Sequence, residues 1–390
     1  MKNTASRSRT LLVLAIVLTA CCLRSPITGV GPLVSTIQAD LGLGSVAAGM
    51  LTTIPLLAFA AASALVGSVS TRLGAGRTMV FSLALLCLGI LCRSWLGTAG
   101  LFVGTIAVGV GIGVNNVLLP GVIKSEFPDR IGPMTGLYST FMAGFATISG
   151  GVSVPIALAG GWRISLCVWV LIALAALLVW LPNRSLRFAA PAGDGKPRRS
   201  VARDSMTWFI AVFTGLQAMA FYCIVAWFSS ILQSKGYDVQ TAGFYNSALM
   251  LVGVPCSFAI PVIAARSKRL SFWGVTLSLL YAVCMVGTIF SGSAVGLWIA
   301  IISGGLASGT GIAFAMTLFP LHTRDAQDAA SLSGLAQAVG YLLAAVGPTA
   351  MGKLFDLTSD WTLPLAALAV LAVVMAAFGY LVGRKHIINE

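Results

Sequence analysis

The sequence predicts an all-α membrane protein of twelve transmembrane helices, arranged as two six-helix bundles related by a parallel repeat. Three observations predict this fold: the composition, the succession of long apolar runs, and a repeat between the two halves of the chain. Of the 390 residues, 58% are hydrophobic and 9% are charged, and the mean hydropathy is +0.95. Because soluble domains carry about 25% charged residues, this chain lacks the charge that would cover a soluble surface.

Each apolar run is long enough to cross a bilayer, which takes about 20 helical residues. Polar or glycine-rich breaks separate the runs, as expected for the loops of a protein that crosses the membrane many times. The predicted spans lie at roughly 11–37, 46–69, 77–95, 99–123, 132–157, 163–182, 207–233, 242–265, 270–290, 294–320, 329–352 and 361–383.

One long polar stretch, 183–205, separates the first six spans from the last six. It contains six Lys and Arg residues, two prolines and two glycines, so it is typical of a linker. The predicted domains are therefore an N-terminal six-helix bundle at 1–182, a basic cytoplasmic linker at 183–205 and a C-terminal six-helix bundle at 206–390.

The two halves share short sequence matches in the same order. Gly109-Val110-Gly111 in the fourth span matches Gly309-Thr310-Gly311 in the tenth, and Thr135-Gly136-Leu137 in the fifth matches Ser333-Gly334-Leu335 in the eleventh. Because each half has an even number of spans, the two repeats share one orientation. This arrangement is typical of secondary transporters whose site lies at the bilayer midplane, between the repeats.

The formal charge of +13 reflects topology. With the N-terminus placed in the cytoplasm, most Lys and Arg residues fall in cytoplasmic segments, as the positive-inside rule requires. Both termini are then cytoplasmic, and nucleic-acid binding is excluded as the reason for the charge. The basic residues assigned to outer segments and their flanks are Arg93, Arg163, Lys235 and Lys353.

Arg24 is the residue on which the functional prediction depends. It lies near the middle of the first apolar run, followed closely by Pro26 and Gly29. A guanidinium at the bilayer centre costs about 2.5–3.5 kcal/mol on insertion scales, and arginine cannot lose its proton to escape that cost. Arg24 must therefore face a protein interior or a wet cavity. It either binds substrate or is a structural group tied to backbone carbonyls loosened around Pro26 and Gly29.

Few other polar side chains lie near the middle of a span, and they are amides and tyrosines. Each amide could equally make only a helix–helix hydrogen bond. The candidate substrate-binding residues are Arg24, Asn115, Asn116, Tyr138, Gln217, Tyr222, Gln337 and Tyr341.

No Asp, Glu, Lys or His lies near the middle of any span, and all eight cysteines lie in apolar runs. A fixed positive charge in such a cavity favours a small anion or an electron-rich polar solute. We therefore predict no catalytic residues, no metal site and no cofactor. Protons are one candidate coupling ion, although the path offers no evident relay.

The turn between the second and third spans, Gly67 to Arg77, resembles the cytoplasmic loop motif of the major facilitator superfamily. Thr71 stands where the family has an Asp, so the contact that this Asp makes between helices is weakened or rebuilt here. The resemblance implies a gating role for this turn, and the alternative is a basic turn that only sets topology. The predicted gating residues are Gly67, Arg72, Gly74 and Arg77.

Three further stretches resemble the branch of the superfamily that transports cyanate and 2-nitroimidazole. They are Leu23-Arg24-x-Pro26-x-Thr28, Asn116-Val117-Leu118-Leu119-Pro120 and Ser333-Gly334-x-Ala336-Gln337. The resemblance covers essentially the whole chain. It implies a multi-pass protein of a bacterial inner membrane, a small-molecule substrate and a monomeric state, without fixing the substrate.

The sequence thus predicts a secondary active transporter for a small anion or a polar solute that bears a nitro or carboxylate group. It would work by alternating access, with Arg24 as the anchor for the substrate. The alternatives are a multidrug-type efflux permease for neutral compounds with a structural Arg24, a membrane enzyme, and a channel. The enzyme alternative is weak because His322 and His386, the two histidines, have no matching catalytic constellation.

Overall fold

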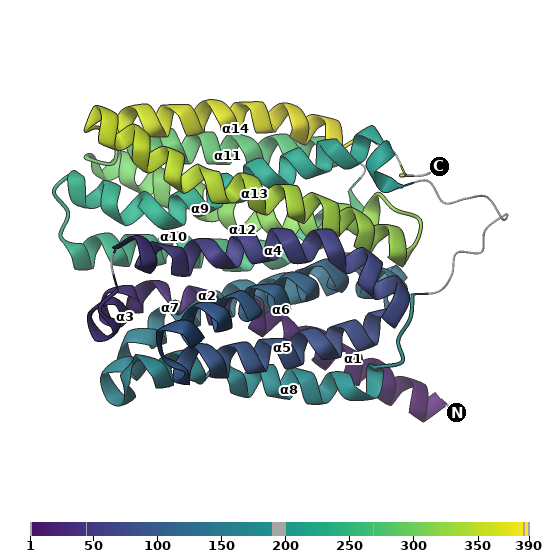
Figure 1. The fold of residues 1–390 in the computed structure, drawn as a ribbon. Coiled ribbons are helices and arrows are strands. Elements are labelled where there is room, and N and C mark those ends of the chain that lie inside the picture. Colours follow the sequence, from purple (N-terminus) through teal and green to yellow (C-terminus); the bar gives the residue numbers. More distant parts are fainter. Residues whose placement is uncertain (1, 44, 189–199, 268, 385–386, 389–390) are drawn as a thin grey trace. The chain divides into compact units, whose positions relative to one another are not determined.

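The structure of the protein is a computed structural model that describes residues 2–43, 45–188, 200–267, 269–384 and 387–388 (Figure 1). All regular secondary structure in these ranges is helical. The α-helices are α1 (Lys2–Cys22), α2 (Ser25–Thr28), α3 (Val34–Leu41), α4 (Ser45–Leu73), α5 (Ala75–Trp95), α6 (Gly97–Glu126), α7 (Ile131–Cys167), α8 (Val170–Trp180), α9 (Ser205–Ser234), α10 (Val239–Arg266), α11 (Leu270–Ile289), α12 (Ala294–Leu321), α13 (Ala326–Thr358) and α14 (Thr362–Val382). Four short 3₁₀ helices are η1 (Gly31–Leu33), η2 (Pro128–Arg130), η3 (Leu181–Asn183) and η4 (Val201–Arg203).

Eleven stretches of the described chain are long and apolar enough to cross a membrane, and one of them accounts for two of the twelve predicted spans. This stretch, Pro128–Asn183, contains 56 residues. At 1.5 Å per residue it is far longer than a bilayer needs. Gly161 lies inside it at φ 85° and ψ 159°, where the helical path breaks. The break coincides with the predicted loop between the fifth and sixth spans.

Side chains that cap helix N-termini set the start of several spans in the C-terminal half. Asp204 accepts a hydrogen bond of 2.9 Å from the Met206 N–H, and Asp238 accepts one of 2.9 Å from the Thr241 N–H. Ser293 accepts one of 3.1 Å from the Gly296 N–H. These acids and hydroxyls satisfy amides that have no partner within the helix, so the spans α9, α10 and α12 begin at these residues.

The first span is interrupted rather than continuous. α1 ends at Cys22, and the chain continues through α2 and the 3₁₀ turn η1 before α3 begins at Val34. Pro26 and Pro32 lie at the start of α2 and η1. Because proline has no N–H and clashes with the preceding turn, it interrupts the hydrogen bonds of a continuous helix. The two prolines thus explain why the helix does not continue past the region of Arg24.

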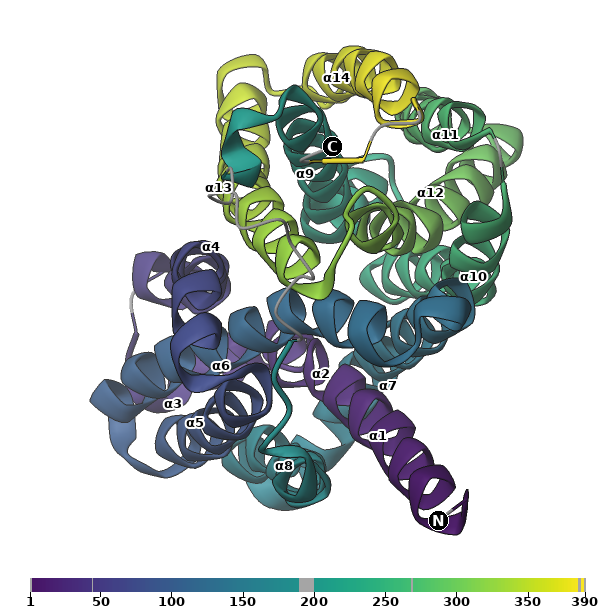
Figure 2. The same cartoon turned by 90° about the vertical axis from the view of Figure 1, so that its right-hand side faces the viewer.

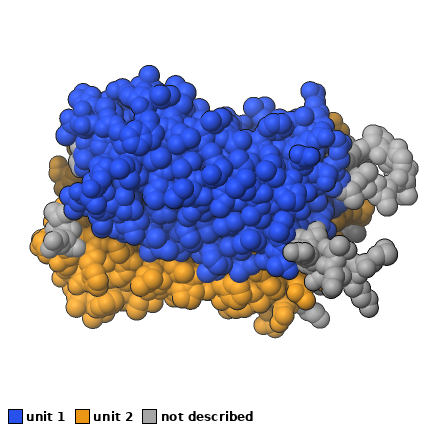
Figure 3. Space-filling view, turned by 90° about the horizontal axis from the view of Figure 1, so that it is seen from below, with its two compact units in different colours: residues 1–127, 137–192, 325–334 blue, residues 128–136, 193–324, 335–390 orange. Residues whose placement is uncertain are grey.

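The described chain divides into two compact units, which Figure 3 colours separately. Unit 1 comprises 1–127, 137–192 and 325–334, and unit 2 comprises 128–136, 193–324 and 335–390. The start of α7 thus belongs to unit 2 and the start of α13 to unit 1. The domain boundaries expected from sequence, at 182/183 and 205/206, remain a prediction.

Unit 1 packs α6 between α4 and α5, and α8 lies against α1 and α5 (Figure 2). One stripe of α5 is buried in this packing. Its members recur every three or four residues and are at most 1% exposed: Met79, Leu83, Leu86, Ile90 and Arg93. This spacing is that of one face of an α-helix. The stripe is apolar until its last member, which is an arginine.

Unit 2 packs α12 between α10 and α11, and α14 lies against α11 and α9. Its interior includes buried aromatic rings, among them Phe213 and Phe314, whose centroids lie 5.9 Å apart in an edge-on arrangement. Aromatic pairs of this geometry contribute about 0.5–1.5 kcal/mol beyond the area that they bury. The rings fix α9 against α12.

Candidate functional site

The interrupted part of the first span is held by hydrogen bonds to and from α7. The Ser149 hydroxyl donates to the Ser25 carbonyl at 2.6 Å, and the Thr28 hydroxyl donates to the Ala146 carbonyl at 3.1 Å. Both bonds join side chains to backbone within unit 1. The Ser25 carbonyl also accepts the Gly29 N–H at 3.3 Å, so the Ser149 hydroxyl adds a second donor to a carbonyl of the interrupted segment. The interruption is thus a defined structure with fixed partners.

Arg24 lies at the start of this interruption and is 8% exposed. Its backbone, at φ −129° and ψ −39°, is outside the helical region. The structure therefore places the residue as the sequence predicted, inside the protein and next to loosened backbone. Whether Arg24 contacts a substrate stays a prediction.

A second buried arginine contacts the same interruption. Arg93, in the last turn of α5, is 1% exposed. Its Nη1 donates to the Pro26 carbonyl at 2.6 Å, and its Nη2 donates to the Leu166 carbonyl at 3.4 Å. The positive-inside rule assigned Arg93 to an outer flank and did not predict that the side chain is buried, because counting charges takes no account of helix faces. The signal was available in the spacing from Met79 to Ile90, which continues to Arg93.

The two asparagines of α6 lie on different faces of the helix. Asn115 lies one turn after Gly111 on the same helix face, and Gly111 packs on Ser82 and Leu86 of α5. The Asn115 amide donates to the Gly111 carbonyl at 2.7 Å. Asn116 lies nearly one turn after Gly113, on the side of the helix that packs on α4. Both asparagines are buried, at 0% and 3% exposed.

Tyr138 lies on the same face of α7 as Ser149, three turns earlier, and is 1% exposed. Ser149 is the α7 residue whose hydroxyl bonds the interruption of the first span. The helix that holds the interruption therefore carries a candidate tyrosine on the same face.

Gln217 of α9 lies in the interior of unit 2 and is 1% exposed. Its Nε2 donates to the Tyr281 hydroxyl of α11 at 3.0 Å, and its Oε1 has no hydrogen-bond partner among the described residues. The absence of a side chain at Gly311 of α12 leaves room for the amide, because a Cβ there would lie 2.8 Å from it. Sequence reasoning did not identify Tyr281, although a hydroxyl in the middle of an apolar run was a usable signal.

The remaining candidates of unit 2 include one bonded pair. The Tyr341 hydroxyl donates to Gln337 Oε1 at 3.2 Å on α13, which is the contact expected for residues four apart on one helix face. Tyr222 of α9 is half-buried, and its ring packs edge-on against Phe221 with centroids 5.3 Å apart.

The turn between α4 and α5 docks on the segment that follows α8. The Gly76 N–H donates to the Leu186 carbonyl at 2.9 Å, and Gly74 takes a positive φ of 90°. Arg72 and Arg77 are exposed. The Thr71 hydroxyl donates to the Ser68 carbonyl of its own helix at 2.8 Å. This bond differs in kind from the interhelical contact that the family's Asp makes.

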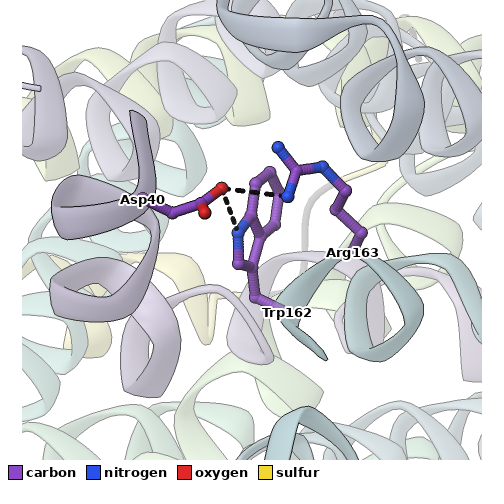
Figure 4. Close-up of polar contacts among 3 residues, drawn as sticks. All are labelled: Asp40, Trp162 and Arg163. Atoms are coloured by element: carbon purple, nitrogen blue, oxygen red, sulfur yellow. Dashed lines mark hydrogen bonds and ion pairs between the residues drawn. The ribbon is translucent and has the colours of Figure 1, made fainter. Parts of the chain in front are cut away.

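A polar clamp joins α3 to the bend in α7 (Figure 4). Asp40 accepts hydrogen bonds from Trp162 Nε1 at 3.0 Å and from Arg163 Nη1 at 2.9 Å. The Arg163 guanidinium also lies 4.4 Å from the centre of the Trp162 ring. The hydrogen bonds from Trp162 and Arg163, with the positive charge of Arg163, hold the pKa of the Asp40 carboxyl below its usual range.

Each unit therefore contains buried polar groups of a different kind. Unit 1 holds two guanidinium groups at the interruption of one span, together with amides and Tyr138. Unit 2 holds amides and tyrosine hydroxyls that bond to one another. Donors buried in apolar helices can bind polar solutes, since such groups interact strongly where water is excluded. The described residues thus offer binding chemistry without an evident catalytic constellation.

Comparison with known proteins agrees with this chemistry. Residues 16–348 match the family model described as Major Facilitator Superfamily. The chain is 42% identical over 383 residues to the uncharacterized transporter YycB of Bacillus subtilis, covering 97% of this chain and 95% of that protein. It is 37% identical over 383 residues to the 2-nitroimidazole transporter of Escherichia coli, covering 97% of each. The cyanate transport protein CynX of Escherichia coli is 24% identical over 365 residues, covering 93% of this chain and 94% of that protein.

The fold is likewise similar to a solved structure. The proton:xylose symporter XylE superposes with a TM-score of 0.77 at 13% identity, covering 97% of this chain and 95% of that one. Helices, apolar spans and family match thus agree on a protein of many transmembrane helices. The chain belongs to the Major Facilitator Superfamily, in the branch of the 2-nitroimidazole and cyanate transporters, and is a transporter rather than an enzyme.

Proposed function

We propose that this protein is a secondary active transporter for a small anion or a polar solute that bears a nitro or carboxylate group. The solute binds Arg24 at the midplane and crosses by alternating access of two six-helix bundles, 1–182 and 206–390, joined by the cytoplasmic linker 183–205. Both termini lie in the cytoplasm of a bacterial cell, and the protein works in the inner membrane as a monomer.

The observation that carries this proposal is the position of Arg24. The residue is buried at an interruption of the first span whose backbone is fixed by Ser149 and Thr28. A guanidinium offers five N–H donors in a planar fork, which matches the two oxygens of a nitro or carboxylate group. A rigid site of this kind spends little free energy on ordering the protein when solute binds.

The relatives support the same class of solute. One is named for 2-nitroimidazole and another for cyanate. A nitro group and a cyanate ion share electron-rich terminal atoms that accept hydrogen bonds. The positive charge of Arg24 would attract the electron-rich atoms of either solute, and the side chains around it would adapt the site to the shape of the solute.

Orienting contacts come from the other candidates. Asn116, Gln217, Gln337 and Tyr341 would hydrogen-bond the solute, with Asn115, Tyr138 and Tyr222 at the margins. Gln217 already bonds Tyr281, and Tyr341 bonds Gln337. Binding would exchange these internal bonds for bonds to solute, so each contributes less to affinity than an unbonded donor would.

The turn that contains Gly67, Arg72, Gly74 and Arg77 is proposed as a gate element. Its contact with the Leu186 carbonyl supports this role, because the turn is fixed to the start of the linker. Protons are the proposed coupling ion, carried by acids at the helix ends, by His322, or by the solute itself.

The test is ligand-dependent thermal stabilisation of the purified protein by 2-nitroimidazole, cyanate, nitrate and acetate. We expect at least one of them to raise the melting temperature, since a ligand that binds only the folded state stabilises it. Arg24→Gln should weaken that solute's binding about 10- to 100-fold, because a hydrogen bond to a charged group contributes about 1.5–3 kcal/mol.

The matched control is Arg163→Gln, which removes a partly exposed arginine of the same unit whose hydrogen bond goes to Asp40 in the clamp. Its affinity for the solute should be unchanged. If Arg24→Gln folds and binds as tightly as the unaltered protein, the anchoring role is wrong.

A second function has one observation in its favour. Arg93 shows that this chain does use a buried guanidinium to hold backbone carbonyls. If Arg24 does the same, the protein is an efflux permease for neutral compounds. In that case none of the three anions cyanate, nitrate and acetate stabilises the protein, and Arg24→Gln lowers its melting temperature.

A further inference from the structure

We propose that Arg93 is a positioning residue that holds the interrupted first span in the geometry that presents Arg24. This inference rests on the proposed function for its effect on binding, and on the contacts of unit 1 alone for its structural part. Arg93 is among the largest fully buried side chains of the protein. Nothing in a merely apolar stripe on α5 requires a cation at this position.

The hydrogen bonds of Arg93 lie at the interruption. Nη1 donates to the Pro26 carbonyl at 2.6 Å, two residues after Arg24. In a continuous helix that carbonyl would accept the N–H of Val30, but Val30 donates to Ile27 at 3.0 Å instead. Arg93 therefore supplies a donor that the interrupted helix does not. A charged donor makes a stronger hydrogen bond than a neutral one.

The same side chain reaches a second element. Nη2 donates to the Leu166 carbonyl near the end of α7, at 3.4 Å. One planar group thus ties α5 to α2 and to α7. Because the guanidinium is rigid, a shift of any one of these three elements would lengthen a bond to another.

The interruption is consequently held from two sides. Ser149 and Thr28 fix it to α7, and Arg93 fixes it to α5. Arg24 lies directly before the fixed segment, so its backbone inherits that position. Loss of Arg93 would remove the donors to the Pro26 and Leu166 carbonyls and leave the bonds of Ser149 and Thr28 intact. This predicts a local effect rather than loss of the fold.

The Nε of Arg93 is buried and has no hydrogen-bond partner among the described residues. Burying an unpartnered N–H is costly. A residue chosen only for packing would not retain such a group, whereas a residue required for its two Nη bonds would. The unpartnered Nε thus favours a positioning role over a packing role.

The structural arm of the test is amide hydrogen exchange in Arg93→Met, an unbranched apolar replacement. We expect exchange in 25–33 to rise at least about tenfold relative to the unaltered protein, with α6 unchanged. Arg93→Lys, which keeps a charged donor, should restore at least part of the protection. The control is Lys235→Gln, which removes a cation bonded to the Ile289 carbonyl in unit 2 and should leave 25–33 unchanged.

The functional arm is a double-mutant cycle read by affinity for 2-nitroimidazole or nitrate. Arg93→Met should weaken binding about tenfold in the presence of Arg24, and should have no further effect in Arg24→Gln. If Arg93 had only a structural role, Arg93→Met would lower the melting temperature by the same amount with and without Arg24→Gln. It would then also weaken binding by the same factor in both backgrounds.

The two arms separate this inference from the proposed function. Increased exchange at 25–33 with no binding of any probe would overturn the proposed function while supporting the positioning role. Unchanged exchange in folded Arg93→Met would overturn the positioning role. Should Arg93→Met fail to fold, unchanged exchange at 25–33 in folded Arg93→Gln, which lacks the charge and the fork of two Nη donors, would overturn it as well.

Discussion

Buried polar side chains in this protein are stabilised by specific partners, because an apolar helix bundle offers no water to replace them. Arg93 bonds two carbonyls and Gln217 bonds Tyr281. Leaving such a group without its partner costs about 1–3 kcal/mol, more than the bond itself contributes. At the scale of single residues, these pairs are where substitutions will be most informative.

Tyr281→Phe should destabilise unit 2 by about 1–3 kcal/mol, because the Gln217 amide would lose its acceptor while its Oε1 already has no partner in the described part of the chain. The measurement is the free energy of unfolding in detergent. The control is Tyr281→Phe combined with Gln217→Met, which removes both partners and should recover most of the loss. A double variant no more stable than Tyr281→Phe would show that the ring hydroxyl, rather than the pair, sets the cost.

At the scale of elements, the clamp between α3 and α7 should depend on pH. The folded-state pKa of Asp40 is lowered, so the clamp stabilises the protein above the ordinary carboxyl pKa of about 3.9. Its contribution is lost as the pH falls through the lower pKa of the folded state. We expect the melting-temperature difference between the unaltered protein and Asp40→Asn to be present at pH 6 and to shrink as the pH falls below about 3.9.

The difference should be small even at pH 6, because both side chains of the ion pair are partly exposed. High salt should reduce it further, since exposed charges are screened. A difference that stayed constant from pH 6 to pH 3 would mean that the carboxylate charge of Asp40 is not what stabilises the clamp.

The docked turn between α4 and α5 gives a second prediction about elements. A Cβ at Gly76 would collide with the Asn183 carbonyl and lie 2.9 Å from the Arg184 backbone. Gly76→Ala should therefore push 183–187 away and accelerate trypsin cleavage at Arg184 and Arg187 several-fold.

Gly67→Ala is the matched control, because Gly67 belongs to the same motif and a Cβ there has nothing within 4 Å. Its cleavage rate should equal that of the unaltered protein. Equal rates for both variants would show that the turn does not protect the start of the linker.

At the scale of the whole molecule, the sequence repeat corresponds to a repeat in packing. Gly109 of α6 packs on Ala58 of α4, and Gly309 of α12 packs on Gly253 of α10. These pairs join the second span to the fourth and the eighth to the tenth. The sequence match between the halves therefore marks close helix contacts, where a side chain larger than hydrogen would not fit.

The fold was largely predictable from sequence, because transmembrane spans are recorded in the length and polarity of each run. The twelve spans agree with the structure, including the bend at Gly161 that separates two of them. The family was predictable from strings such as Leu23-Arg24-x-Pro26. The candidate site was predictable only as a set of residues, since hydropathy does not say which helix face meets which neighbour.

The sequence by itself determined that this is a transporter of the Major Facilitator Superfamily and that Arg24 lies inside the protein. A charged side chain in the middle of an apolar span would otherwise face lipid, which is costly. Only the tertiary structure decided the partners of the other polar groups. Arg93, counted with the outer flanks, is buried against Pro26, and Gln217 is bonded to Tyr281, 64 positions along the chain. Such pairings depend on helix rotation and packing, which the order of residues along one span does not specify.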